Sequence, residues 1–175
     1  MKKVIISTLM TVALMAAFSA SAKSADLGFR IGKVLSAEIS SVPPEIISLD
    51  RYPNALPAKR IYAVVVLKMT PNRSLSALDY SLVINQTTSP CIAIVCNMAS
   101  FVCDPEATYP SEKDYARLLF IIDANRVKLP AAGKTIKATL KTNIKNRNNV
   151  ALNVLSKGNA AFSDCTKLPA DGALK

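Results

Sequence analysis

Two segments of the sequence carry apolar side chains on both alternations of a strand. They are RIYAVVVLKM, residues 60–69, and ARLLFIID, residues 116–123, and both are rich in β-branched or aromatic residues. Because successive side chains of a strand point to opposite faces of a sheet, such a run needs cover on both faces. We therefore expect two central strands, each buried on both sides.

The segment KTIKATLKTNI, residues 134–144, has a different pattern, because apolar Ile136, Ala138 and Leu140 alternate with polar residues. This alternation is typical of a strand with one face buried and the other in water. Further strands are predicted in FRIGKVLSAEI, DYSLVIN, CIAIVC and VALNVL, with turn-rich pieces such as TPNRS, NQTTSP and NIKNRNN between them.

Together these segments predict an all-β fold of about seven short strands, arranged as an antiparallel two-layer β-sandwich rather than a barrel or an α/β sheet. The chain shows no internal repeat and no helical pattern of useful length. Its ten prolines, Pro90 among them, are assigned mainly to connections, where a missing N–H does not interrupt a ladder. The longest irregular segment is expected between Ser40 and Arg60.

The order of IYAVVVLKMTPN, LSALDYSLV, PCIAIV and ARLLFIID resembles that of small bacterial secreted immunoglobulin-like domains. In those domains a strand that is apolar on both faces is followed by a turn, a short DYSL-type strand and a later LLF-type strand. The resemblance implies an immunoglobulin-like sandwich and a role in adhesion or ligand binding. The chain departs from true immunoglobulin domains in having no tryptophan and no widely spaced inter-sheet cysteines, and no functional residue is carried over.

The first 22 residues have the three parts of a secretory signal: a charged start at Lys2 and Lys3, an apolar run, and the small-residue site Ala20-Ser21-Ala22. The apolar run, from Val4 to Phe18, is shorter than the roughly 20 residues that a spanning helix needs. We expect cleavage to leave a single domain, residues 23–175, with no membrane span, in the periplasm or outside the cell.

Three of the four cysteines lie close together, at Cys91, Cys96 and Cys103, and the fourth is Cys165. Their spacing does not form the paired short motifs of a zinc site, and an even count behind a secretory signal indicates two disulfides. If CIAIVC is a strand, Cys91 and Cys96 are about 17 Å apart and cannot bond to each other. We therefore predict the pairs Cys96–Cys103 and Cys91–Cys165, unless a bulge changes the register.

The chain contains no histidine, which excludes Ser-His-Asp and Cys-His catalysis and histidine-ligated metals within it. The segment KLPAAGKT, residues 128–135, differs from a phosphate-binding loop in its first glycine, and a strand rather than a helix follows it. We interpret it as a turn in which Gly133 supplies a permissive backbone. We predict no catalytic, metal or cofactor site, although chemistry by paired carboxylates on an envelope glycan stays open as an alternative.

The 22 lysines and arginines, two of them in the signal segment, outnumber the 12 acidic residues, so the exported part favours polyanions. The candidate anion-binding face comprises Lys134, Lys137, Lys141, Lys145 and Arg147. Alternating lysines also keep a strand soluble and block edge pairing, so a purely solubilising role is the competing interpretation. Missing aromatic platforms disfavour nucleic acid. We predict a non-catalytic exported protein that binds an anionic envelope polymer or another protein; the oligomeric state stays open.

If the four cysteines form two disulfides, protein taken from the periplasm has no reactive thiol when it is unfolded without reductant. Reduction should then lower the free energy of unfolding by about 2–5 kcal/mol. Thiol labelling with and without reductant measures the first quantity, and urea unfolding measures the second. Stoichiometric labelling of the unreduced protein would contradict the disulfides.

Overall fold

The computed structural model describes nine segments of the chain, all within one compact unit, Ile31–Lys175: residues 34–44, 47–48, 52, 55–68, 74–95, 101–102, 108–110, 115–143 and 149–163. Their strands are β1 (Val34–Ser40), β2 (Ile47–Ser48), β3 (Arg60–Lys68), β4 (Ser74–Ser76), β5 (Tyr80–Ile84), β6 (Thr87–Val95), β7 (Phe101–Val102), β8 (Thr108–Pro110), β9 (Tyr115–Asp123), β10 (Thr135–Thr142) and β11 (Val150–Gly158). A 3-10 turn, η3 (Ala77–Asp79), precedes β5. Over these segments, no helix has the length and apolar character needed to cross a membrane.

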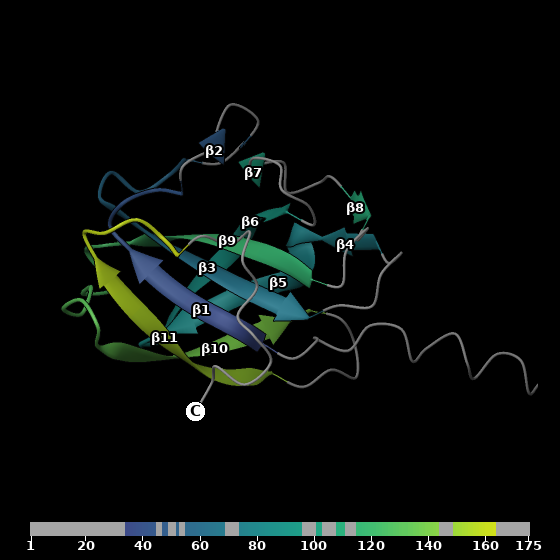
Figure 1. Cartoon of the computed structure of the whole chain (residues 1–175). Coiled ribbons are helices and arrows are strands. Elements are labelled where there is room, and N and C mark those ends of the chain that lie inside the picture. Colours follow the sequence, from purple (N-terminus) through teal and green to yellow (C-terminus); the bar gives the residue numbers. More distant parts are fainter. Residues whose placement is uncertain are drawn as a thin grey trace, which may run out of the picture. The chain divides into compact units, whose positions relative to one another are not determined.

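Seven strands form one closed barrel in the order β1-β11-β10-β5-β6-β9-β3, with β3 returning to β1. All neighbours in the barrel are antiparallel except β1 and β11, which run parallel. Figure 1 shows β1 between β3 and β11, with β10 beyond β11. Two short pairs, β2–β7 and β4–β8, form separate two-stranded sheets.

The prediction of an all-β fold is confirmed, but the prediction of two separate layers is wrong, because the sheet closes at two corners. At one corner β6 changes partner: its residues 87–90 pair with β5, and its residues 91–95 pair with β9. At the other corner β1 pairs with β3 along its length and with β11 only at its end, from Glu38 to Ser40. A strand that passes from one sheet to the next in this way makes a corner instead of an edge.

Pro90 lies inside β6 and not in a connection. Four of the six residues of the predicted turn NQTTSP, residues 87–90, also belong to β6. The turn itself is Asn85-Gln86, and it joins Ile84 directly to Thr87. Pairs that flank a two-residue turn are hydrogen-bonded, and hydrogen-bonded and non-hydrogen-bonded pairs then alternate along the ladder. Pro90 opposite Ser81 therefore falls in a non-hydrogen-bonded pair, where its missing N–H removes no bond to β5.

The barrel interior is an apolar core to which all seven strands contribute. Alternate residues of the two doubly apolar strands point inward: Ile61, Ala63, Val65 and Leu67 from β3, and Ala116, Leu118, Phe120 and Ile122 from β9. Among the described residues, Phe120 is the largest side chain that is fully buried. The predicted inward face of residues 134–144 is confirmed over its described part, since Ala138 and Leu140 are buried in this core and Ile136 packs against it.

The other alternation of β3 and β9 forms a second apolar cluster on the outside of the barrel, together with residues of β6 and Leu35 of β1. We call this surface the covered face. The segment between β1 and β3 covers it with Ile47, Tyr52 and Leu56, and the segment after β11 adds Phe162. The prediction that β3 and β9 are buried on both sides is therefore confirmed.

Two buried serines stabilise the corner between β1 and β11. The hydroxyl of Ser40 donates to the carbonyl oxygen of Ala160 at 2.6 Å and accepts a hydrogen bond from the Val42 N–H at 3.0 Å. On β11, the hydroxyl of Ser156 donates to the carbonyl oxygen of Pro130 at 2.7 Å and accepts from the Gly158 N–H at 3.1 Å. Each hydroxyl thus bonds backbone groups at the ends of these strands and in the segments beside them.

Replacing Ser40 with Ala should lower the free energy of unfolding by about 1 kcal/mol, because the Val42 N–H and the Ala160 carbonyl both lose their hydrogen bond to the buried Ser40 hydroxyl. Ser41→Ala is the matched control, since the Ser41 hydroxyl bonds the exposed side chain of Asn159 at 2.7 Å and the Gly158 carbonyl at 3.3 Å, which keeps its bond from the Ser41 N–H. That change should stay within about 0.5 kcal/mol. Urea unfolding of both variants measures the difference, and equal effects would contradict a specific role for the buried hydroxyl.

Candidate functional site

The outer surface of β5, β10 and β11 is the exposed side of the barrel, and we call it the open face. On these three strands, Leu82, Ala138 and Val154 point inward and belong to the interior core. The residues that alternate with them therefore point outward. The outward residues are Ser81 and Val83 on β5, Thr135, Lys137, Thr139 and Lys141 on β10, and Ala151, Asn153 and Leu155 on β11.

The strand register arranges these residues in rows across the open face. One row consists of Val83, Thr139 and Ala151, which are paired directly across the three strands. The next row toward the start of β10 pairs Lys137 with Asn153, and on the opposite side of the small row Lys141 pairs with Ser81. Small, uncharged side chains therefore separate two rows that each contain a lysine.

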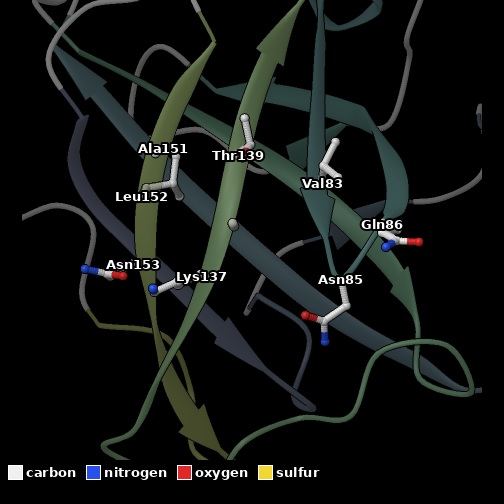
Figure 2. A pocket seen from close by; sticks show the side chains of 9 residues that line it. Val83, Asn85, Gln86, Lys137, Thr139, Ala151, Leu152 and Asn153 are labelled. Atoms are coloured by element: carbon white, nitrogen blue, oxygen red, sulfur yellow. The ribbon is translucent and has the colours of Figure 1, made fainter.

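A groove of about 580 Å³ lies over the small row and the row of Lys137 and Asn153, bounded by the three strands and by the turn that follows β5, while Lys141 and Ser81 lie outside its lining. It is lined by Val83, Asn85, Gln86, Lys137, Ala138, Thr139, Ala151, Leu152 and Asn153. Figure 2 shows the side chain of Lys137 extending from β10 toward that of Asn153 on β11. Asn85 and Gln86 lie at the other rim.

The electrostatic character of the open face is positive. The sequences of β5, β10 and β11 contain no aspartate or glutamate, and Lys137 and Lys141 are both exposed. The acidic residue closest in sequence to these three strands is Asp79, immediately before β5. Over the part of the chain that the structure describes, neither lysine has a carboxylate within ion-pair distance. Their charges are thus available to an anionic ligand.

The turn at the rim of the groove has an unusual backbone. Asn85 has φ 47° and Gln86 has φ 66°, the left-handed conformation that both central residues of a tight hairpin turn require. Asn tolerates this region, whereas Gln pays a steric penalty that Gly avoids. Asn-Gly would suit the turn better than Asn-Gln, so a strained backbone holds the Gln86 side chain at the groove.

The structure describes three of the five predicted anion-binding residues. Lys137 and Lys141 share the open face as predicted, and Lys134 is exposed immediately before β10. Lys145 and Arg147 lie outside the described residues. Sequence reasoning missed Asn85, Gln86 and Asn153, because their place beside Lys137 follows from the pairing of strands distant in sequence; only the Asn-Gln turn carried a local signal.

Lys157 also points outward from β11, but it forms an ion pair with an acidic residue. Its Nζ lies 3.9 Å from Oε1 of Glu38 on β1. The same carboxylate accepts hydrogen bonds from the N–H of Ser163 at 2.8 Å and from its hydroxyl at 2.5 Å. Glu38 therefore anchors the segment that carries Phe162 onto the covered face, and Lys157 belongs to that anchor and not to the groove.

Of the four cysteines, Cys91 is described, and Cys96, Cys103 and Cys165 lie outside the described residues. Cys91 is 2% exposed within the interior core, and its Sγ lies 3.2 Å from the carbonyl oxygen of Ala93. The register shifts between Cys91 and Ala93, so β6 has a bulge at this point. A bulge here is the condition under which the predicted cysteine pairing could change. The two predicted pairs stay predictions.

The segment KLPAAGKT forms a turn that leads into β10, and the interpretation of Gly133 is confirmed by its φ of 79°. The N–H of Gly133 donates to the carbonyl oxygen of Ser156 at 2.8 Å, and the Ser156 N–H donates to the carbonyl of Lys134 at 2.7 Å. These backbone groups pair with β11 and do not form a cradle for phosphate.

A second groove, of about 380 Å³, lies where β6 and β9 diverge at the edge of the covered face. Its lining includes Tyr52, Thr88 and a single carboxylate, Asp123. One oxygen of Asp123 accepts a hydrogen bond from the Asn125 N–H at 2.9 Å, and the other lies 3.8 Å from Nε of Arg126. Among its described residues, neither groove thus brings together the two carboxylates of a glycosidase. No group of three or more potential metal ligands gathers within the described segments.

No protein-family model matches this chain, and no curated protein is significantly similar to it. The geometry and charge of the open face are therefore the basis for a functional conclusion.

Replacing Gln86 with Gly should raise the free energy of unfolding by about 0.5–1 kcal/mol, because Gly adopts a φ of 66° without a Cβ clash, partly offset by its freer unfolded chain. Thr88→Gly, two residues on in β6, is the matched control and should lower stability by a similar amount. Thermal unfolding compares the two variants. A loss of stability in Gln86→Gly would contradict strain in the turn.

Proposed function

We propose that this chain is an exported, non-catalytic binding module whose open face holds an extended anionic polymer of the cell envelope. The observation that carries the proposal is the coincidence of the groove with Lys137 on three strands that contain no acidic residue. The secretory signal pattern and the excess of basic residues support the same conclusion.

The spacing of the two lysines favours a polymer over a small anion. Lys137 and Lys141 are four residues apart on one strand, so their Cα atoms are separated by about 13 Å. A single phosphate or carboxylate does not span this distance, whereas an extended chain with several charges contacts both ammonium groups. Attraction of this kind is long-range and depends on salt, because it acts through exposed charges.

We also infer immunoglobulin-like connectivity, with β1, β3, β5, β6, β9, β10 and β11 as the seven successive strands. What supports it is the strand order: β1-β3-β9-β6 follows the ABED sheet of a constant-type immunoglobulin domain, and β11-β10-β5 follows its CFG sheet in reverse. In this chain the two sets join at both corners. Such a framework serves many unrelated functions, so the proposed role depends on the open face alone.

The double variant Lys137→Gln/Lys141→Gln should bind heparin about tenfold more weakly than the parent at low salt, since each exposed ion pair contributes roughly 0.2–1 kcal/mol. The slope of log affinity against log salt should fall by roughly 2, because two fewer cations are neutralised by ligand. Fluorescence polarisation with labelled heparin fragments measures both quantities.

The matched control is Lys59→Gln/Lys128→Gln, which removes the same net charge at two exposed sites that line neither groove. At physiological ionic strength it should leave heparin affinity within about twofold of the parent, since distant charges are then screened beyond roughly 8 Å. If both double variants lose affinity equally, only net charge matters and the open face is not the binding site.

A further inference from the structure

Amide side chains line the groove on both sides of Lys137. Asn153 is paired with Lys137 across β10 and β11, and Asn85 and Gln86 line the same groove from the turn. An amide side chain both donates and accepts hydrogen bonds, whereas an ammonium group only donates. The groove therefore offers acceptors next to its positive charge, and a ligand that satisfies them must carry donors of its own.

Charge is sparse along the groove. The row between the two lysines consists of Val83, Thr139 and Ala151, none of them charged. A polymer with a charge on every unit, such as polyphosphate, would place uncompensated charges over this row. A polymer in which acidic units alternate with uncharged ones places its charges near the lysines and an uncharged unit over the small side chains.

Aromatic stacking is not part of this surface. The single aromatic residue of β5, β10 and β11 is Tyr80, and it is buried in the interior core. Stacking platforms are what single-stranded nucleic acids use on other β-sheet surfaces. Hydroxyl groups, which match amide donors and acceptors, are the more suitable partners here.

Resting on the proposed function, we propose that the ligand is an acidic polysaccharide in which carboxylated sugars are spaced by uncharged, hydroxyl-bearing sugars. Lys137 binds a carboxylate, Asn153 and Gln86 exchange hydrogen bonds with the hydroxyl or amide groups of the adjacent uncharged sugar, and Lys141 binds the next carboxylate along the chain. The small row of Val83, Thr139 and Ala151 forms the floor beneath the uncharged sugar.

The strained turn gives this assignment a distinctive consequence. Gln86 has a positive φ that Gly would adopt without strain, and its side chain lines the groove. For stability of the fold alone, Gly would be more favourable than Gln at this position. In Gln86→Gly, stability should therefore rise while affinity for the polysaccharide falls, two changes in opposite directions that a structural role does not produce.

The experiment measures binding of the full exported chain to hyaluronan fragments, in which carboxylated and uncharged sugars alternate, and to inorganic polyphosphate. The variant Gln86→Gly/Asn153→Val should bind hyaluronan about tenfold more weakly, since two hydrogen bonds are removed. It should bind polyphosphate as the parent does, because no lysine is changed. Asn125→Ser, which alters an exposed amide outside this groove, is the matched control and should change neither affinity.

The outcomes separate the two proposals. If the amide variant binds hyaluronan as tightly as the parent, or loses hyaluronan and polyphosphate affinity to the same extent, the polysaccharide assignment is overturned while the anion-binding face stands. If the parent binds neither polymer, or if Lys137→Gln/Lys141→Gln binds both as tightly as the parent, the proposed function itself is wrong.

Discussion

Strands β3 and β9 carry apolar side chains on both faces, and burying both faces determines how the rest of the chain is used. The inward sets pack in the barrel core, where Phe120 is fully buried. The outward sets need a second cover, which the segments around Tyr52, Leu56 and Phe162 provide. On the other side, the outward side chains of β10 and β11 are mostly exposed in the described part of the chain.

Closure of the barrel depends on polar contacts at its corners. The parallel pairing of β1 and β11 is short, and Ser40 and Ser156 complete it by bonding backbone groups of the adjoining segments. At the opposite corner β6 passes from β5 to β9, with Pro90 in a non-hydrogen-bonded pair and a register shift just after Cys91. Buried hydroxyls thus satisfy backbone groups where the ladder stops at one corner, and a register shift lets β6 change partner at the other.

The open face and the covered face differ because the same alternation rule acts on different residues. Every second position of β10 is polar, so its outer side stays in water and carries Lys137 and Lys141. The amides that flank Lys137 come from β11 and from the turn after β5, more than 50 residues away in the case of Gln86. The proposed polysaccharide site is therefore assembled from three strands, and the strain at Gln86 is confined to its rim.

Local pattern alone determined the all-β class, the inward and outward residues of β10, the double burial of β3 and β9, and the turn at Gly133. Each follows from which neighbours share a face or need a positive φ, and these are properties of a few consecutive residues. Only the tertiary structure decided the closure of the barrel, the bulge after Cys91 and the position of Pro90 within β6. It also decided that Asn85, Gln86 and Asn153 line the same groove as Lys137. These features depend on which strands pair and in what register, and that choice is made by packing and hydrogen bonds between segments far apart in the chain, which no local periodicity encodes.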